Sequence, residues 1–83
     1  MAKAIEWTPQ ARADVRRIDR KTALSLLEAL ADYVINGHGD VERLQDVDPP
    51  ELRLRIGDYR MRFYDREDAI VILRVLHRRE AYR

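Results

Sequence analysis

The sequence predicts an α+β fold in which two helices near the N-terminus pack on a small antiparallel sheet, in the order β-α-α-β-β-β. Two patterns support this order. Apolar residues recur at helical spacing over residues 9–35, and they alternate with basic residues at strand spacing over residues 52–64. A chain of 83 residues buries only about 60%, or slightly more, of the surface that its unfolded chain exposes, so every element must contribute to one core. We therefore expect residues 1–83 to form a single domain.

The N-terminal part is predicted to form a short strand followed by a helix. Residues 2–7 alternate in the manner of a strand. Thr8 and Pro9 are typical of a helix start, because Thr is a favoured N-cap and proline at the first helical position has no donor to lose. The apolar face of this helix consists of Ala11, Val15 and Ile18.

A second helix is predicted over residues 21–35, ended by Asn36 and Gly37. Its apolar face contains Ala23, Leu24, Leu27, Leu30, Ala31 and Val34. We expect the two helices to form a hairpin that packs on the sheet. Residues 37–51 form a polar connection, in which residues 41–47 are the best candidate for one turn of helix.

The clearest local signal is a β-hairpin that turns at Gly57 and Asp58. A two-residue loop fixes the register of the strands on either side. The predicted pairs are Ile56 with Tyr59, Arg55 with Arg60, Leu54 with Met61 and Arg53 with Arg62. Four arginines then share one face of the sheet.

Such an arginine face has two interpretations. Guanidinium groups are planar, permanently charged donors that suit phosphate, which indicates an anion site. Alternatively, it is a solvated sheet face, neutralised in part by the carboxylates Asp58, Asp65, Glu67 and Asp68. The net charge of +1 by itself argues nothing for nucleic acid, but the positive charge is concentrated where the hairpin is. Residues 51–83 hold nine Lys/Arg against six Asp/Glu, whereas residues 1–50 hold seven against nine.

The apolar run at residues 69–76 predicts a central strand, because it is apolar on both faces. Pairing this strand back across a turn at residues 65–68 sets Tyr64 against Ala69 and Arg62 against Val71. In that register His77 lies on the arginine face and Arg74 points toward the core. A bulge would reverse the later residues.

The C-terminal tail, residues 77–83, supplies an imidazole at His77, a carboxylate at Glu80 and a phenol at Tyr82. Together with the arginines, these groups fit metal-free RNA cleavage. That reaction needs a base for the 2′-hydroxyl, cations for the phosphate, an acid for the leaving oxygen and an aromatic platform for a base ring. The competing interpretation is a frayed, solvated terminus.

Composition excludes several classes of site. The chain has no cysteine, so disulfides, thiolate metal sites and a catalytic thiol are excluded. Its two histidines, His38 and His77, are far apart in sequence. We therefore expect no metal and no cofactor. We also expect a cytoplasmic protein with no membrane partner, because no apolar run approaches the roughly 20 residues of a membrane span and none has the form of a signal peptide.

Two stretches carry a resemblance to a known family. R-L-R-I-G-D-Y-R at residues 53–60 and V-L-H-R-R-E-A-Y at residues 75–82 resemble the RelE/ParE superfamily of toxins from toxin-antitoxin modules, and RelE more than ParE. The similarity spans essentially the whole chain. RelE-like toxins have two N-terminal helices on a small antiparallel sheet and cleave messenger RNA in the ribosomal A site without a metal, and a cognate antitoxin holds them inactive.

The resemblance implies roles for individual residues. Catalytic roles fall on Arg60, His77, Arg78 and Tyr82, and RNA-binding roles fall on Arg53, Arg55 and Arg62. Well-studied members carry lysines on the first hairpin strand, where this chain has arginines that hardly deprotonate. The role of general base is therefore expected to move to His77, with Glu80 as second choice.

The resemblance leaves three functions open. The first is a ribosome-dependent endoribonuclease that inhibits translation. The second is a ParE-like inhibitor of DNA gyrase, which is favoured if His77 points away from Arg60. The third is an inactive, RNA-binding relative. In each case we expect a cognate antitoxin as partner, with its segment on the basic hairpin face.

Overall fold

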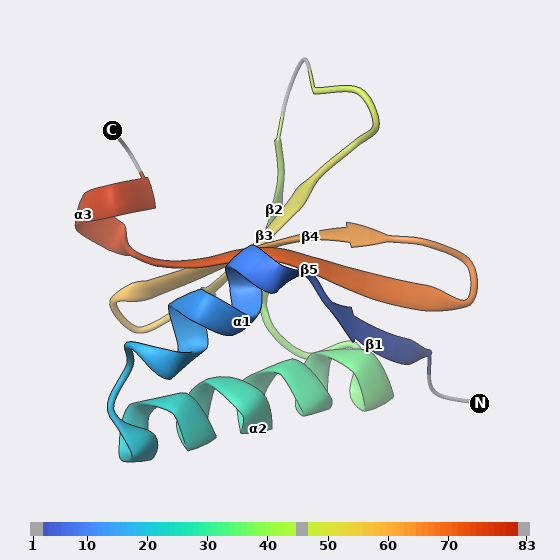
Figure 1. Ribbon diagram of the computed structural model, residues 1–83. Coiled ribbons are helices and arrows are strands. Elements are labelled where there is room, and N and C mark those ends of the chain that lie inside the picture. The colour runs from blue at the N-terminus through green and yellow to red at the C-terminus, as the bar shows by residue number, and fades with distance from the viewer. Residues whose placement is uncertain (1–2, 45–46, 82–83) are drawn as a thin grey trace.

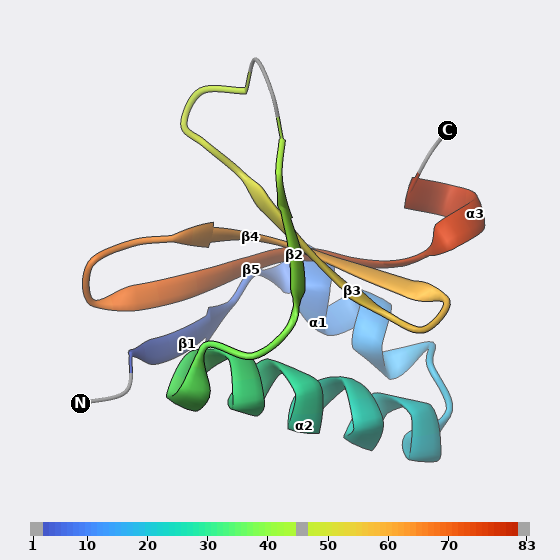
Figure 2. The ribbon, with the colours of Figure 1, turned by 180° about the vertical axis from the view of Figure 1, so that it is seen from behind.

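The computed structural model describes residues 3–44 and 47–81, which form a five-stranded sheet with helices on one face. The elements are β1 (Ala4–Trp7), α1 (Pro9–Arg16), α2 (Arg20–Asn36), β2 (Asp40–Arg43), β3 (Leu52–Ile56), β4 (Tyr59–Asp65), β5 (Ala69–His77) and α3 (Arg78–Ala81). The strand order is β1-β5-β4-β3-β2. Helices α1 and α2 lie side by side under the sheet, and β2 rises from the end of α2 away from the helices (Figures 1 and 2).

The predicted α+β class, the Thr8-Pro9 start of the first helix and the Gly37 stop of the second are confirmed, whereas α1 ends at Arg16 and does not include Ile18. Thr8 is the N-cap of α1 and accepts a hydrogen bond from the Ala11 N–H at 3.2 Å. The same hydroxyl donates to the Ile72 carbonyl at 2.9 Å, which ties the start of α1 to β5. Helix α2 ends at Gly37, whose φ of 73° is left-handed and favours glycine.

Two features of the sheet differ from the prediction. Residues 40–43 form the edge strand β2 rather than a turn of helix, and β2 pairs antiparallel with β3. Its carboxylates Asp40 and Glu42 stand opposite Arg55 and Arg53, and such cross-strand charge pairs stabilise a strand that has little apolar surface. Strand β1 runs parallel to β5, so the sheet is mixed rather than wholly antiparallel.

The register between β4 and β5 also differs from the prediction. Tyr64 pairs with Val71 rather than Ala69, and Arg62 pairs with Arg74 rather than Val71. The shift at Tyr64 comes from the turn, where Asp65 pairs with Ile70. The further shift at Arg62 comes from an irregularity at Arg62/Phe63, where β5 has one extra residue. Because successive side chains alternate between faces, this bulge turns Arg74 away from the core and puts His77 on the same face as its partner Tyr59.

The core lies between the sheet and the two long helices. Its buried side chains include Leu26 and Leu30 from α2, Leu54 from β3, Met61 and Phe63 from β4, and Ile70, Ile72 and Val75 from β5. These strand residues occupy alternate positions, and the arginines of β3 and β4 fall between them. The packing of the helices therefore leaves the arginine face of the sheet uncovered by α1 and α2.

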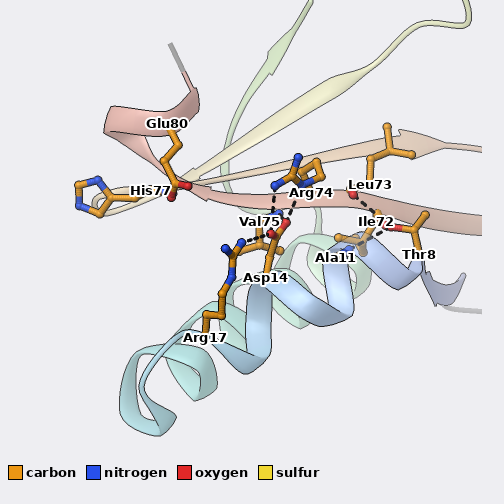
Figure 3. Close-up of polar contacts among 10 residues, drawn as sticks. All are labelled: Thr8, Ala11, Asp14, Arg17, Ile72, Leu73, Arg74, Val75, His77 and Glu80. Carbon is orange, nitrogen blue, oxygen red and sulfur yellow. Dashed lines mark hydrogen bonds and ion pairs between the residues drawn. The ribbon is translucent and has the colours of Figure 1, made fainter. Parts of the chain in front are cut away.

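Asp14 of α1 fastens the helical layer to β5 (Figure 3). Strand β1 pairs with β5 only as far as Ile72. Beyond Ile72, the Asp14 carboxylate is hydrogen-bonded to the edge of β5. Its Oδ2 accepts from the Val75 N–H at 2.9 Å and from Nε of Arg74 at 2.8 Å, and Oδ1 accepts from Arg17 at 2.7 Å. Burial alone would raise the pKa of Asp14. The hydrogen bonds from these donors lower it by more than burial raises it, so the pKa lies below the ordinary value of 3.8.

We predict that Asp14→Asn lowers the free energy of unfolding at pH 7 by about 2 to 4 kcal/mol, because it removes one partner of a buried, charge-assisted network. A lowered pKa in the folded state stabilises the protein above the unfolded value, and this contribution is lost as the pH falls below 3.8 toward the folded value. Urea unfolding of the wild type and of Asp14→Asn between pH 7 and pH 2.5 should show that the difference between their free energies of unfolding becomes smaller as the pH falls. The exposed Asp68→Asn is the control, and a difference independent of pH would contradict the assignment.

Candidate functional site

The sheet surface opposite α1 and α2, called here the outer face, collects the arginines. The hairpin register is confirmed, with Arg53 opposite Arg62 and Arg55 opposite Arg60. The bulge adds Arg74, which stands opposite Arg62. The predicted gathering of arginines on one face is therefore correct, and it contains one residue more than the sequence indicated.

Several of these guanidinium groups are paired with carboxylates of the same chain. Arg62 donates to Glu51 from Nε at 2.9 Å and from Nη2 at 2.7 Å. Arg53 lies 3.6 Å from Glu42, and Arg55 lies 3.8 Å from Asp40. The last two pairs are long and involve exposed carboxylates, so they contribute little stability and can exchange for a phosphate.

Arg60 differs from the other arginines of the outer face because it is only 4% exposed. Its Nη1 donates to the carbonyls of Gly57 at 2.8 Å and Tyr59 at 2.9 Å. The side chain thus folds over the hairpin turn, where Gly57 has a φ of 56°. The family resemblance implies a catalytic role for Arg60, and the structure gives this arginine hydrogen bonds to the backbone of the hairpin turn.

Arg78 is brought to the hairpin turn from the other end of the chain. It is the first residue of α3, and its N–H donates to the Asp58 carbonyl at 2.6 Å. Its Nε lies 3.8 Å from Oδ1 of Asp58, and the side chain is 60% exposed. The predicted meeting of the C-terminal segment with the hairpin is therefore correct for Arg78.

His77 does not reach the arginines of the hairpin, so its predicted place on the arginine face is wrong. The His77 ring packs edge-on against Tyr59, with the ring centroids 5.5 Å apart. Its Nδ1 accepts from the Arg79 N–H at 3.2 Å, and Oε1 of Glu80 accepts from the His77 N–H at 3.3 Å. This reciprocal pair is a capping box that starts α3, and the His-x-x-Glu spacing is the signal that identifies it.

Glu80 turns toward the helices (Figure 3). It lines a cavity of about 180 Å³ with Asp14, Arg17, Ile18, Tyr59 and Val75. His77 therefore lies away from the hairpin arginines, and Glu80 lies on the side of the sheet that carries Asp14 and Arg17. Tyr82, the remaining predicted catalytic residue, lies outside the described residues.

Neither a metal-binding cluster nor a membrane-spanning helix is found among the described residues. Within residues 3–44 and 47–81, the His, Asp and Glu side chains form no group of three that could hold a metal ion. No helix in the same ranges is long and apolar enough to cross a membrane.

Comparisons with known proteins place the chain in a family. The family described as the ParE toxin of the type II toxin-antitoxin system parDE matches residues 5–82. No curated protein sequence matches the chain.

Several solved structures are similar to it, among them the following three. An archaeal RelE-RelB complex from Pyrococcus horikoshii OT3 shares 20% identity over 94% of this chain and 97% of the other, with a TM-score of 0.77. The toxin-antitoxin complex RelBE2 of Mycobacterium tuberculosis shares 23% identity over 93% and 99%, with a TM-score of 0.74. The YoeB dimer of Staphylococcus aureus shares 22% identity over 89% and 94%, with a TM-score of 0.72. At these identities the likeness establishes a common fold.

We predict that Arg60→Ala destabilises the protein by about 2 kcal/mol, because it removes charge-assisted hydrogen bonds from two carbonyls at the hairpin turn. For a domain of this size the melting temperature should fall by roughly 10 °C. Arg55→Ala is the matched control on the facing strand. The Arg55 side chain is 48% exposed, so the melting temperature of the Arg55→Ala variant should differ little from that of the wild type. Equal melting temperatures for the two variants would show that Arg60 is not a structural residue.

Proposed function

Because this chain belongs to the ParE toxin family, within the RelE/ParE superfamily, we propose that this type II toxin cleaves messenger RNA on the ribosome. The observation that carries the proposal is the outer face itself. Arg53, Arg55 and Arg62 lie on adjacent strands, and Arg78 joins them at the hairpin turn. A surface of this kind suits a sugar-phosphate backbone.

The chemistry assigned to the outer face is electrostatic. Attack of a 2′-hydroxyl on the neighbouring phosphate concentrates negative charge on the non-bridging oxygens. Guanidinium donors fixed beside that phosphate stabilise the charge in the transition state more than in the ground state. Arg78 is the best placed for this role, because it is exposed and anchored through its own backbone to Asp58.

The roles of the remaining residues change accordingly. Arg53 and Arg55 hold the RNA by exchanging their exposed carboxylate partners for phosphates, whereas Arg62 keeps its bonds to the buried Glu51 and contacts the RNA with its remaining N–H groups. Arg60 maintains the hairpin turn and so positions its neighbours. His77 and Glu80 act through the cap of α3, which sets the place of Arg78. Tyr82 keeps the catalytic role that the family resemblance implies.

A cognate antitoxin is expected for a toxin of this family, and the helical side offers it a second surface. A groove of about 390 Å³ there is lined by Trp7, Arg12, Val15, Arg16 and Leu27. Leu24 and Leu27 of α2 are large apolar residues that remain exposed. An amphipathic antitoxin segment with acidic residues along one edge would fit this groove, in addition to the hairpin face.

The alternative function is inhibition of DNA gyrase, as a toxin that binds without cutting RNA. One observation favours it: His77 and Glu80 point away from the arginines, so neither can serve as a base on the outer face. The two functions differ in what is damaged in the cell. Gyrase inhibition breaks DNA and leaves messenger RNA intact, whereas the proposed activity leaves DNA intact.

We predict that adding the purified protein to a translating extract creates new messenger RNA ends. Arg78→Ala should reduce their rate of formation by roughly 100-fold or more, the effect of losing one donor to a developing charge. The neighbouring Arg79→Ala is the control and should retain activity. If the wild type leaves messenger RNA whole but causes gyrase-dependent DNA breaks, the gyrase alternative replaces this proposal.

Substitutions of His77 distinguish its role as the N-cap of α3 from a role as general base. Asparagine at this position can accept the same N–H bond as an N-cap but cannot act as a base. We therefore predict that His77→Asn keeps most of the RNA cleavage rate, whereas His77→Ala loses part of it together with α3 structure. Loss of cleavage in both variants, with melting temperatures unchanged, would assign His77 a chemical role.

A further inference from the structure

A second feature of the sheet lies at the end of β4 that is farther from the hairpin turn. It is a hollow of about 340 Å³ between the beginning of β3, the end of β4 and residues 49–50. Its main lining residues are Arg43, Pro49, Pro50, Leu52, Tyr64 and Arg66. None of these residues has a role in the site described above.

The hollow is positively charged because its arginines are not neutralised by nearby carboxylates. Across residues 3–44 and 47–81, the ion pairs of the structure involve neither Arg43 nor Arg66. Asp65, which also lines the hollow, is paired with Lys3 and accepts from the Tyr33 hydroxyl at 3.4 Å. In this respect the hollow contrasts with the hairpin, where Arg53, Arg55 and Arg62 have partners.

The hollow also presents flat rings. Tyr64 follows Arg62 by two residues on β4, so it shares the outer face. The Arg66 guanidinium lies over the Tyr64 ring, with its Cζ 5.8 Å from the ring centroid. Pro49 and Pro50 add exposed apolar surface to the lining. Aromatic faces and guanidinium planes stack on nucleobases, while guanidinium donors hold phosphates.

We propose that this hollow binds one nucleotide of single-stranded RNA, with the base stacked on Tyr64 and the phosphate held by Arg43 and Arg66. The inference rests on the proposed RNA-directed function and extends it. Four residues along a strand cover about 13 Å, so one RNA strand would run along β4 from the hairpin turn past Arg62 to Tyr64. The hollow would then hold the substrate in register outside the cleavage site.

The test is the binding of a fluorescently labelled, single-stranded oligoribonucleotide, followed by anisotropy at several salt concentrations. Tyr64→Leu removes the ring and should increase Kd at least about fivefold, whereas Tyr64→Phe keeps the ring and should bind like the wild type. Arg43→Gln with Arg66→Gln should weaken binding and reduce the salt slope by roughly 0.7 for each arginine in a phosphate contact. Arg12→Gln with Arg16→Gln, on the helical side, is the matched control.

Melting temperatures of all variants verify that each is folded. If the Tyr64→Leu and Arg43/Arg66 variants bind as the wild type does while the wild type still cuts messenger RNA, the hollow has no role and the proposed function stands. If the wild type neither binds RNA nor cuts it, the proposed function fails and this inference fails with it. Weaker binding in both ring and charge variants, with the Tyr64→Phe and helical-side controls unchanged, supports the hollow as a nucleotide site.

Discussion

The structure depends on the carboxylate of Asp14, which fastens the helical layer to the edge of β5. Strand β1 is too short to cover that edge, and Asp14 bonds the Val75 N–H and the Arg74 guanidinium where β1 has ended. The bond fixes which face of the sheet the helices cover. Because that face takes the alternate apolar residues of β3, β4 and β5, the arginines between them are left on the other face. The Asp14 contacts thus hold the helices on one face of the sheet and leave the hairpin arginines on the other.

The same geometry divides the molecule into two functional sides. The outer face carries paired but exchangeable arginines, the anchored Arg78 and the hollow beside Tyr64. The helical side carries an apolar groove beside Trp7. A nucleic acid and an antitoxin therefore need not compete for identical contacts, although an antitoxin segment that reached the hairpin could displace RNA. Internal ion pairing on the outer face also means that binding must exchange one partner for another, which favours a strongly charged ligand such as a phosphate backbone.

Sequence patterns predicted most of the fold because local rules governed those parts. The Thr8-Pro9 start, the Gly37 stop and the Gly57-Asp58 hairpin each follow from backbone conformation or hydrogen bonding within a few residues. Strand β2 was missed because its strand character comes from opposite charges on β3 rather than from apolar alternation. His77 was misplaced because one extra residue in β5 reverses every later side chain, and nothing in the sequence marks that bulge. The partners Glu42, Glu51 and Asp40 could not be predicted, because they depend on tertiary placement.

We propose that RNA contacts the arginines of the outer face and makes no contact with the helical side. Nuclear magnetic resonance of the labelled protein with a short, non-cleavable RNA tests it directly, because guanidinium Nε–H signals report the arginines and the single tryptophan, Trp7, reports the helical side. We expect the signals of Arg55, Arg62 and Arg78 to shift on RNA addition while the Trp7 indole signal stays in place. A shifted indole beside unchanged arginine signals would contradict it.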